Sequence, residues 1–347
     1  MSLPLVSIIT PTFNHEKFIG PCIDSVIGQT YQSWEQIIID DGSTDTTAAV
    51  AQSYSDSRIL YVHQPNSGIG ALAGTYNHAL SMARGKFVAI LEGDDLWPPD
   101  KLANLIPHLI NSDIVLAFGG VAEVSADGTW SGRVGRAVRR RRSLPRRILF
   151  NDPPGSATRY MLRADGADFI PASTAVIRTS TLRSIGGFQH FPNLCVTDFP
   201  TFISLTLKGR FYYTPQIMGY RRRHRGSATY ENQYQISSGA RSYAKSFMAQ
   251  HGLTLDCKEA ESIEKSWHAS RRDSEFTAGR LCLMDGMWQQ ARVHFQCAMD
   301  VSLPRLFVAS SMGWVLTWLH CDFELLLGLA GYATLRNETQ RNLSRTQ

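Results

Sequence analysis

Three carboxylates crowd one short stretch, residues 92–95, which reads Glu-Gly-Asp-Asp and follows the apolar run 86–91. Like charges this close repel one another unless a cation sits among them. Mg²⁺ and Mn²⁺ prefer oxygen ligands and commonly take one or two protein carboxylates together with substrate phosphates. The stretch is therefore a candidate site for a divalent metal. The alternative is an ordinary acidic turn before Pro98 and Pro99, in which Asp95 only caps a helix.

A second acidic turn, residues 40–43, follows the apolar run 36–39 and reads Asp-Asp-Gly-Ser. A carboxylate here can accept a hydrogen bond from an imide N–H, the kind of donor that uracil presents, and Gly42 permits the turn. The alternative is a helix N-cap formed by Asp41 or Ser43.

Short apolar runs alternate with amphipathic stretches and must position these turns. The pattern predicts strands at residues 5–10, 36–39, 58–63, 86–91 and 113–118, and helices at 19–27 and 72–83. This alternation is typical of βαβ units, so we expect an α/β fold with a mainly parallel sheet flanked by helices. Ligands of such sheets bind beyond the carboxyl ends of the strands. Residues 11–14, 40–41 and 92–95 should therefore meet at one edge.

The later chain divides into a loop-like part and a helical part. Residues 119–165 are rich in Gly, Pro, Ser and Arg, which predicts a long mobile excursion. Strands are expected at 169–177 and 211–220, with a helix at 199–207. Beyond residue 230 the pattern is helical, so we expect one domain at 1–228 and a helical C-terminal region at 229–347.

Within the helical region, four small or aromatic residues have the mutual spacing of a tetratricopeptide helix pair. They are Gly279, Ala291, Phe295 and Ala298. A solenoid normally needs three or more such units, and one is visible here. The alternative is a helical hairpin that packs on the main domain.

The composition sets further limits on the class of protein. With 347 residues, 43% hydrophobic and 19% charged, the chain is an ordinary globular one rather than disordered, collagenous or coiled-coil. Its six cysteines include no C-x-x-C pair, which argues against a zinc site or a disulfide scaffold and favours the reducing cytoplasm. The N-terminus has no signal-peptide pattern. The uncharged run 306–321 is shorter than the roughly 20 residues of a spanning helix.

Seven arginines fall between residues 136 and 147, although the formal net charge is only +5. One interpretation is an anionic membrane surface as a partner, since each basic residue near such a surface contributes about 1 kcal/mol. The apolar stretch 306–335 fits a peripheral membrane contact at the inner face of the cell membrane. The alternatives are a solvated loop and a buried C-terminal helix pair. Nucleic acid is not expected, because no nucleic-acid fold or aromatic platform is recognisable.

Taken together, three motifs resemble the family 2 inverting glycosyltransferases, whose fold is called GT-A. The motifs are Val6-Ser7-Ile8-Ile9-Thr10-Pro11-Thr12-Phe13-Asn14, Asp40-Asp41-Gly42-Ser43-Thr44-Asp45 and Glu92-Gly93-Asp94-Asp95-Leu96-Trp97. The resemblance continues through Gly186-Gly187-Phe188, Thr197-Asp198, Tyr220-Arg221 and His224, and covers residues 3–227. Three motifs at strand ends in this order are more specific than any one alone.

The resemblance implies a role for each matching residue. Pro11, Thr12 and Phe13 would line the nucleobase pocket, and Asp41 would accept from uracil. Asp94 would be the metal ligand of a D-x-D-type motif whose first position, Glu92, would face the ribose or the metal, with Gly93 letting the backbone pass close to the ligand. Asp198 would be the general base, and His224 and Arg222 would contact the diphosphate. Without the resemblance, Asp198 reads as a helix cap and residues 221–225 as a solvated basic loop.

Three positions depart from the family pattern. Glu92 stands where the motif has Asp, Thr197 where Glu is common, and Tyr76 where many members have an Arg before Asn77. One base and one charge-stabilising site still suffice for inverting transfer, which is a single displacement at the anomeric carbon.

The sequence thus predicts a glycosyltransferase that needs a divalent metal, Mn²⁺ or Mg²⁺. It would move a hexose or N-acetylhexosamine from a nucleotide sugar, with UDP as the expected nucleotide, to a hydroxyl of a glycan or lipid-linked acceptor. One alternative is an inactive scaffold with the same fold. Another is a nucleotide-cofactor oxidoreductase, suggested by Gly68-x-Gly70-x-x-Ala73. That motif does not follow the first strand and lacks an acidic ribose contact at the expected distance.

Overall fold

The structure is a computed structural model that describes residues 3–125, 128, 130–134, 143–163, 169–222, 224, 227, 232–284 and 286–320. The chain divides into two units. The first comprises Met1–Val124, Gly128–Leu162 and Gly166–Arg223, and the second Ser125–Asp127, Arg163–Asp165 and His224–Gln347. The domain boundary expected at residue 228 remains a prediction.

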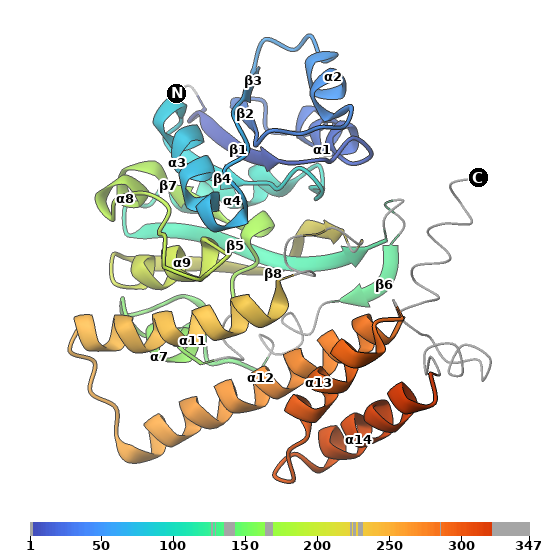
Figure 1. The fold of residues 1–347 in the computed structure, drawn as a ribbon. Coiled ribbons are helices and arrows are strands. Elements are labelled where there is room, and N and C mark those ends of the chain that lie inside the picture. Colours follow the sequence, from blue (N-terminus) through green and yellow to red (C-terminus); the bar gives the residue numbers. More distant parts are fainter. Residues whose placement is uncertain are drawn as a thin grey trace. The chain divides into compact units, whose positions relative to one another are not determined.

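The first unit is built on an eight-stranded sheet (Figure 1). Its N-terminal half contains β1 (Val6–Thr12), β2 (Trp34–Asp40), β3 (Ile59–His63) and β4 (Phe87–Ile90) in the order β3-β2-β1-β4. All three pairings are parallel, as predicted. Every residue of β1, β2 and β4 is buried, which explains the apolar runs at residues 8–9, 37–39 and 87–90.

The second half of the sheet is mixed. β7 (Val176–Arg178) lies antiparallel between β4 and β5 (Ile114–Val124), and β5 also pairs with β8 (Arg210–Arg222) in parallel and with β6 (Trp130–Val134) in antiparallel orientation. The strand predicted at 169–177 is therefore mostly wrong. Pro171 has no N–H for a strand ladder and instead precedes the short 3₁₀ helix η3 (Ala172–Thr174).

The loop predicted at 119–165 is also wrong over much of its described length. β5 continues to Val124, and β6, α6 (Arg146–Leu149) and α7 (Thr158–Met161) follow. Gly119 interrupts the apolar pattern because β8 passes too close for a side chain: a Cβ there would lie 2.3 Å from Met218 Cγ. Residues 135–142, which carry most of the arginine run, lie outside the described residues.

Helices cover the sheet of this unit. They are α1 (Ile19–Ile27), α2 (Thr47–Gln52), η1 (Ile69–Ala71), α3 (Leu72–Met82), α4 (Lys101–Leu109), α8 (Thr179–Ser184) and α9 (Asp198–Thr206). The stripe predicted on α1 packs as expected, with Cys22 and Val26 in one apolar cluster and Ile19 and Ile23 in another. Each such buried aliphatic side chain contributes about 1.5–3 kcal/mol.

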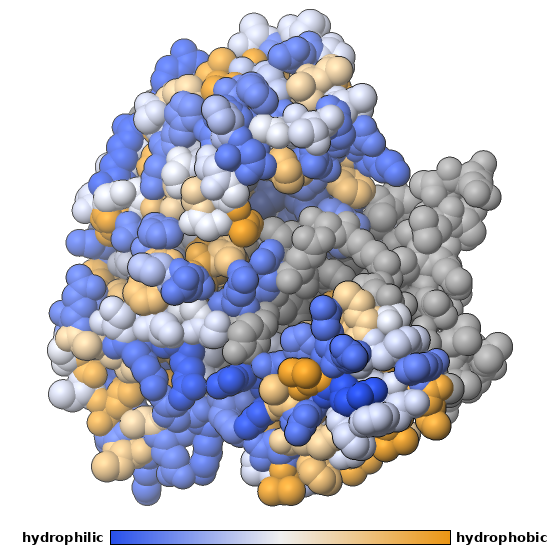
Figure 2. All heavy atoms as spheres, in the orientation of Figure 1, coloured by the Kyte–Doolittle hydropathy of each residue, from blue (hydrophilic) through white to orange (hydrophobic). Residues whose placement is uncertain are grey.

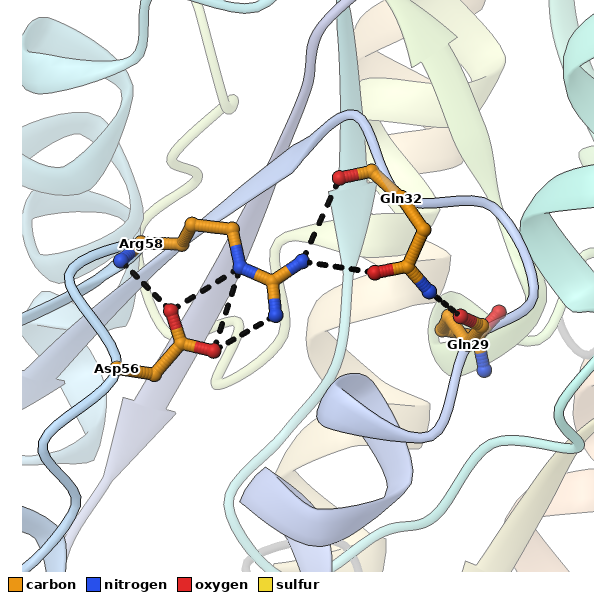
Figure 3. A network of polar contacts seen from close by, with 4 residues as sticks. All are labelled: Gln29, Gln32, Asp56 and Arg58. Atoms are coloured by element: carbon orange, nitrogen blue, oxygen red, sulfur yellow. Dashed lines mark hydrogen bonds and ion pairs between the residues drawn. The ribbon is translucent and has the colours of Figure 1, made fainter.

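A polar network fixes the loops that lead into β2 and β3 (Figure 3). The Arg58 guanidinium donates to Asp56 at 2.7 Å and to Gln32 Oε1 at 3.1 Å, and it lies 3.6 Å above the ring of Trp34. Gln32 donates in turn to the carbonyl of Gln29. These contacts brace the start of the strands, at the opposite end from the polar turns.

The second unit is helical, as predicted. It contains α11 (Gln233–Gln250), α12 (Cys257–Met284), α13 (Trp288–Ala298) and α14 (Pro304–Trp318) (Figure 1). The buried ring of Phe295 on α13 lies against Gly279 on α12 and Gly313 on α14. α12 and α13 thus form the expected helix pair, and its tetratricopeptide character remains a prediction. Among the described residues, no helix is both long and apolar enough to cross a membrane.

Candidate active site

Main-chain hydrogen bonds join the turns after β2 and β4 directly to the end of β1. The N–H of Asp41 donates to the carbonyl of Thr12 at 2.9 Å, and the N–H of Gly93 donates to the carbonyl of Pro11 at 3.0 Å. These bonds extend the parallel pairing of β1 with its two neighbours beyond the ends of the strands. The three sequence motifs therefore meet at one edge of the sheet, as the sheet-edge rule predicts.

Glycine is required at position 93 by a close approach. A Cβ on Gly93 would lie 2.6 Å from Thr12 Oγ1 and 2.9 Å from His15 Nδ1, closer than Cβ atoms come to other heavy atoms. The acidic turn therefore presses against the end of β1. This contact is made to protein side chains, whereas the sequence suggested an approach to a ligand.

The acidic turn is also held from its other side by the end of β8. The N–H of Arg222 donates to the Asp95 carboxylate at 2.9 Å, and Arg222 Nε donates to the carbonyl of Asp94 at 2.8 Å. Leu96 and Tyr220 form an antiparallel bridge with hydrogen bonds of 3.1 and 2.8 Å. Arg222, which is 4% exposed, thus supports the backbone that carries Asp94. Its expected contact with a diphosphate remains a prediction.

Negative charge accumulates in this turn. Burial and the neighbouring charge of Asp94 raise the pKa of Glu92 to about 7. Burial, Asp94 and Glu92 also hold the pKa of Asp95 well above its usual range. Since each carboxylate penalises the ionisation of the others, a bound cation would stabilise the ionised turn. The electrostatics therefore fit a divalent metal.

His15 joins Asp94 at this point, although the sequence analysis did not identify it. A nitrogen of His15 and a carboxylate oxygen of Asp94 lie within 4.8 Å of each other, and both residues are partly buried. His15 Nδ1 is 3.1 Å from Thr12 Oγ1. Imidazole and carboxylate are both ligands of Mn²⁺-like ions. The sequence signal for this ligand is a histidine in the turn that follows the first strand.

Asp41 faces the loop after β3. Its carboxylate accepts from Gln64 Nε2 at 2.6 Å and from the N–H and hydroxyl of Ser67 at 3.2 and 3.0 Å. A carboxylate has about four acceptor positions, so it can accept a further N–H. Phe13, 42% exposed, presents an aromatic ring beside the same edge. Gln64 and Ser67 were not predicted, because their role depends on where the loop folds.

Tyr76 on α3 is hydrogen-bonded to the acidic turn. Its hydroxyl donates to Glu92 Oε1 at 2.9 Å, and its ring packs on Phe188 with centroids 4.8 Å apart. Burial, Glu92 and also Asp198 raise the pKa of Tyr76. The sequence comparison identified Tyr76 only as a departure from the Arg that many family members have at this position. In the structure, Tyr76 instead donates a hydrogen bond to Glu92.

Asp198 is the first residue of α9, where its Oδ1 accepts from the N–H of Phe199 at 2.7 Å. Its charge also raises the pKa of Glu92, so the two carboxylates share one electrostatic environment. His224 lies two residues beyond β8, at the start of the second unit, and is partly buried. These residues would together suit displacement of a charged leaving group. Asp94 and His15 would bind a cation, Asp198 would accept a proton and Asp41 would accept an N–H.

The chain is similar to known glycosyltransferases. The family model described as Glycosyl transferase family 2 matches residues 7–185. The chain is 40% identical over 129 residues to the glycosyltransferase TuaG of Bacillus subtilis (strain 168), a match covering 36% of this chain and 50% of TuaG. It is 35% identical over 147 residues to the UDP-Glc:alpha-D-GlcNAc-diphosphoundecaprenol beta-1,3-glucosyltransferase WfgD of Escherichia coli, covering 42% and 54%. The chain spans about half the length of these curated relatives.

A solved structure has the same fold. The mannosyltransferase PcManGT from Pyrobaculum calidifontis, in complex with GDP-Man and Mn²⁺, aligns with a TM-score of 0.53 at 18% identity. The alignment covers 90% of this chain and 87% of that one.

Proposed function

Because this chain belongs to glycosyl transferase family 2, we propose that it is a metal-dependent inverting transferase that moves a sugar from a nucleotide diphosphate to a hydroxyl. The donor in this proposal is a UDP-hexose or UDP-N-acetylhexosamine, and the acceptor is a polysaccharide or a lipid-linked glycan. The observation that carries the proposal is the single sheet edge at which main-chain hydrogen bonds hold the turn with Asp41 and the acidic turn against the end of β1. The name of WfgD, which specifies UDP-Glc and a diphosphoundecaprenol acceptor, supports the choice of substrates.

The nucleotide would bind along the ends of β1 and β2. Pro11, Thr12 and Phe13 form one wall for the base. The Asp41 carboxylate already accepts from Gln64 and Ser67, and its remaining acceptor position takes the imide N–H of the base. Glu92 and Gly93 lie next in line for the ribose. If a base without that N–H replaced uracil, one acceptor position of the Asp41 carboxylate would have no donor. The site therefore favours UDP.

Asp94, with His15 beside it, would hold Mn²⁺ or Mg²⁺, and the residues fit such an ion by charge and by donor type. When bound, the metal neutralises the charge that develops on the leaving diphosphate. In this proposal His224 and Arg222 contact the diphosphate, as the family resemblance implies.

Asp198 would act as the general base. The hydrogen bond from the Phe199 N–H fixes one carboxylate oxygen at the start of α9. The oxygen of the acceptor hydroxyl attacks the anomeric carbon, and the Asp198 carboxylate takes the proton of that hydroxyl. The bond to the diphosphate breaks on the opposite face, so the configuration inverts in one step. No second catalytic carboxylate is needed, in contrast to a glycoside hydrolase.

The test is nucleoside diphosphate release from a panel of nucleotide sugars, with Mn²⁺, with Mg²⁺ and with EDTA. We expect release that depends on metal and is fastest with a UDP-sugar. Asp94→Ala should abolish metal-dependent donor binding in calorimetry, whereas the control Asp113→Asn, distant in sequence and outside the turns, should bind as wild type. No release with any donor, together with normal donor binding, would favour the inactive scaffold.

The oxidoreductase alternative has lost its basis. Residues 68–73 form η1 and the start of α3 after β3, and the family is one of transferases. A Rossmann fingerprint would instead follow the first strand.

We also propose a peripheral contact with an anionic membrane on the cytoplasmic side. Val308, Met312, Val315 and Leu319 repeat along one face of α14 and its end and are 49–63% exposed, and hydrophobic side chains gather over this helix in Figure 2. Trp318, 58% exposed, carries the Arg292 guanidinium 3.5 Å above its ring. An apolar stripe with aromatic and basic residues is typical of interfacial helices. Co-sedimentation with anionic but not neutral vesicles, lost in Val308→Asp/Val315→Asp, is the expected result.

A further inference from the structure

Gln64, the residue after β3, is anchored by its backbone at the same edge of the sheet. Its N–H donates to the carbonyl of Asp40 at 2.9 Å, which continues the parallel pairing of β3 with β2 by one further bond. The side chain therefore starts beside the turn that carries Asp41. Its amide nitrogen, Nε2, donates to Asp41 Oδ1 at 2.6 Å, the shortest hydrogen bond that the structure gives this carboxylate.

One face of α3 completes the surroundings of the Gln64 amide. Thr75 and His78 are three positions apart on this helix, so they lie on the same face. Gln64 Nε2 donates to Thr75 Oγ1 at 3.0 Å, and Gln64 Oε1 lies 2.9 Å from His78 Nδ1. The protein therefore engages both the nitrogen and the oxygen of the amide.

The chemistry of these partners determines which way the amide points. A carboxylate only accepts hydrogen bonds, so the nitrogen of Gln64, and not its oxygen, must face Asp41. The amide oxygen then faces His78, and because that oxygen also only accepts, His78 Nδ1 carries the proton. His78 thus supports the amide orientation that the contact with Asp41 requires.

The two oxygens of the Asp41 carboxylate are engaged unequally. Oδ1 accepts from Gln64 Nε2, from the Ser67 hydroxyl at 3.0 Å and from the Ser67 N–H at 3.2 Å. Among the residues that the structure describes, Oδ2 receives only a share of that same Ser67 N–H, at 3.3 Å. Each carboxylate oxygen has about two acceptor positions. The protein therefore fills Oδ1, and Oδ2 keeps an acceptor position for a ligand.

We propose that Gln64 is a positioning residue that sets the base specificity of the site, with His78 as its support. The terminal torsion of an aspartate side chain is broad, so the direction of the Asp41 carboxylate depends on its hydrogen bonds. By holding Oδ1, Gln64 leaves Oδ2 as the atom that meets the imide N–H of uracil. This inference rests on the proposed function, because Asp41 meets a base only if the site binds a nucleotide.

The first experiment compares UDP with CDP by calorimetry in the presence of Mn²⁺, because cytosine has a ring-nitrogen acceptor where uracil has the imide N–H. The measured quantity is the ratio of the dissociation constants, CDP over UDP. Wild type should prefer UDP by about 10- to 100-fold, as expected for one hydrogen bond to a charged group. Gln64→Leu should lower the ratio about tenfold through weaker UDP binding, because the Asp41 carboxylate is then free to turn.

This ratio distinguishes positioning from a merely structural role. Damage to the loop would weaken UDP and CDP alike, and the unchanged ratio would overturn the proposal. The matched control is Gln32→Leu, the same substitution at the opposite end of the strands, which loses the bond to the Gln29 carbonyl and should keep the wild-type ratio. His78→Leu, at an exposed position of α3, should lower the ratio several-fold. A wild-type ratio in His78→Leu would overturn the assignment of His78 as the support.

The second experiment repeats Gln64→Leu in an Asp41→Ala background. Without the carboxylate the preference for UDP should be lost, and Gln64→Leu should not change the ratio further. A further change would show that Gln64 acts on the base by another route, and would overturn the proposal. Wild type that binds neither nucleotide would refute the proposed function and this inference with it. A preference for UDP that persists in Gln64→Leu would refute the inference alone.

Discussion

Gly93→Ala is expected to damage the site while leaving the fold intact. The new Cβ would lie 2.6 Å from Thr12 Oγ1, 2.8 Å from Thr12 Cβ and 2.9 Å from His15 Nδ1. Ordinary van der Waals contacts begin near 3.4 Å, so the turn and the end of β1 must separate by several tenths of an ångström. One of the three atoms is a Cβ next to the backbone of a buried strand, so the collision cannot be relieved by rotating a side chain.

The magnitude follows from this geometry. Forcing an extra methyl group into a packed site typically costs about 1–3 kcal/mol of stability. A displacement approaching 1 Å of the turn that carries Asp94 can lower turnover by about 10²-fold. Activity should therefore fall much further than stability. The matched control is Gly74→Ala on α3, where nothing lies within 4 Å of the added Cβ. That variant should gain roughly 0.5–1 kcal/mol of helix stability.

The assay combines thermal unfolding with steady-state release of nucleoside diphosphate. We expect a folded Gly93→Ala variant with a lowered Tm and kcat/KM about 100-fold below wild type, and a fully active Gly74→Ala variant. Wild-type kcat/KM in Gly93→Ala would refute the claim that the contact between the acidic turn and β1 sets the catalytic geometry.

The remaining predictions concern three other contacts. Tyr76→Phe removes the hydroxyl that donates to Glu92, so donor KM should rise several-fold in kinetic titrations while Tm changes by only a few degrees. Arg222→Lys loses the Nε bond to the Asp94 carbonyl, which a lysine cannot reproduce; metal affinity by calorimetry should fall, and an unchanged affinity would show that the support is dispensable. Burial alone would raise the pKa of Glu35, but hydrogen bonds from Ser7 and Arg84 outweigh it and hold that pKa below its ordinary value. Because the folded state favours the ionised carboxylate, its stabilising contribution should be present at neutral pH and lost as pH falls below about 4.5, and Glu35→Gln should flatten this part of the stability curve.

The elements that position the site could be predicted because their signals are local. β1 and β2 are buried along their whole length and show short apolar runs at residues 8–9 and 37–39, and α1 shows its stripe at helical spacing. The sheet-edge rule then places the turns at 12, 41 and 93 together without further information.

Other features depend on contacts between distant parts of the chain and left little local signal. β5 passes through Gly119, which reads as a loop residue until β8 is laid beside it. The bond from Arg222 to the acidic turn joins residues more than 120 positions apart. Lys101 would be placed on the surface by its type alone. Its burial follows from the hydrogen bond to the Ser173 carbonyl and from the Trp97 ring beside it.

The central claim is that Asp198 is the base for a transfer whose donor is held by the acidic turn and Asp41. The most direct measurement is a paired one on Asp198→Asn: nucleotide-sugar binding by calorimetry and glycosyl transfer to an acceptor by product formation. Donor affinity within about twofold of wild type, with transfer reduced by 10²-fold or more, is the predicted result. Transfer at the wild-type rate would contradict the claim, because the reaction would then proceed without the Asp198 carboxylate as proton acceptor.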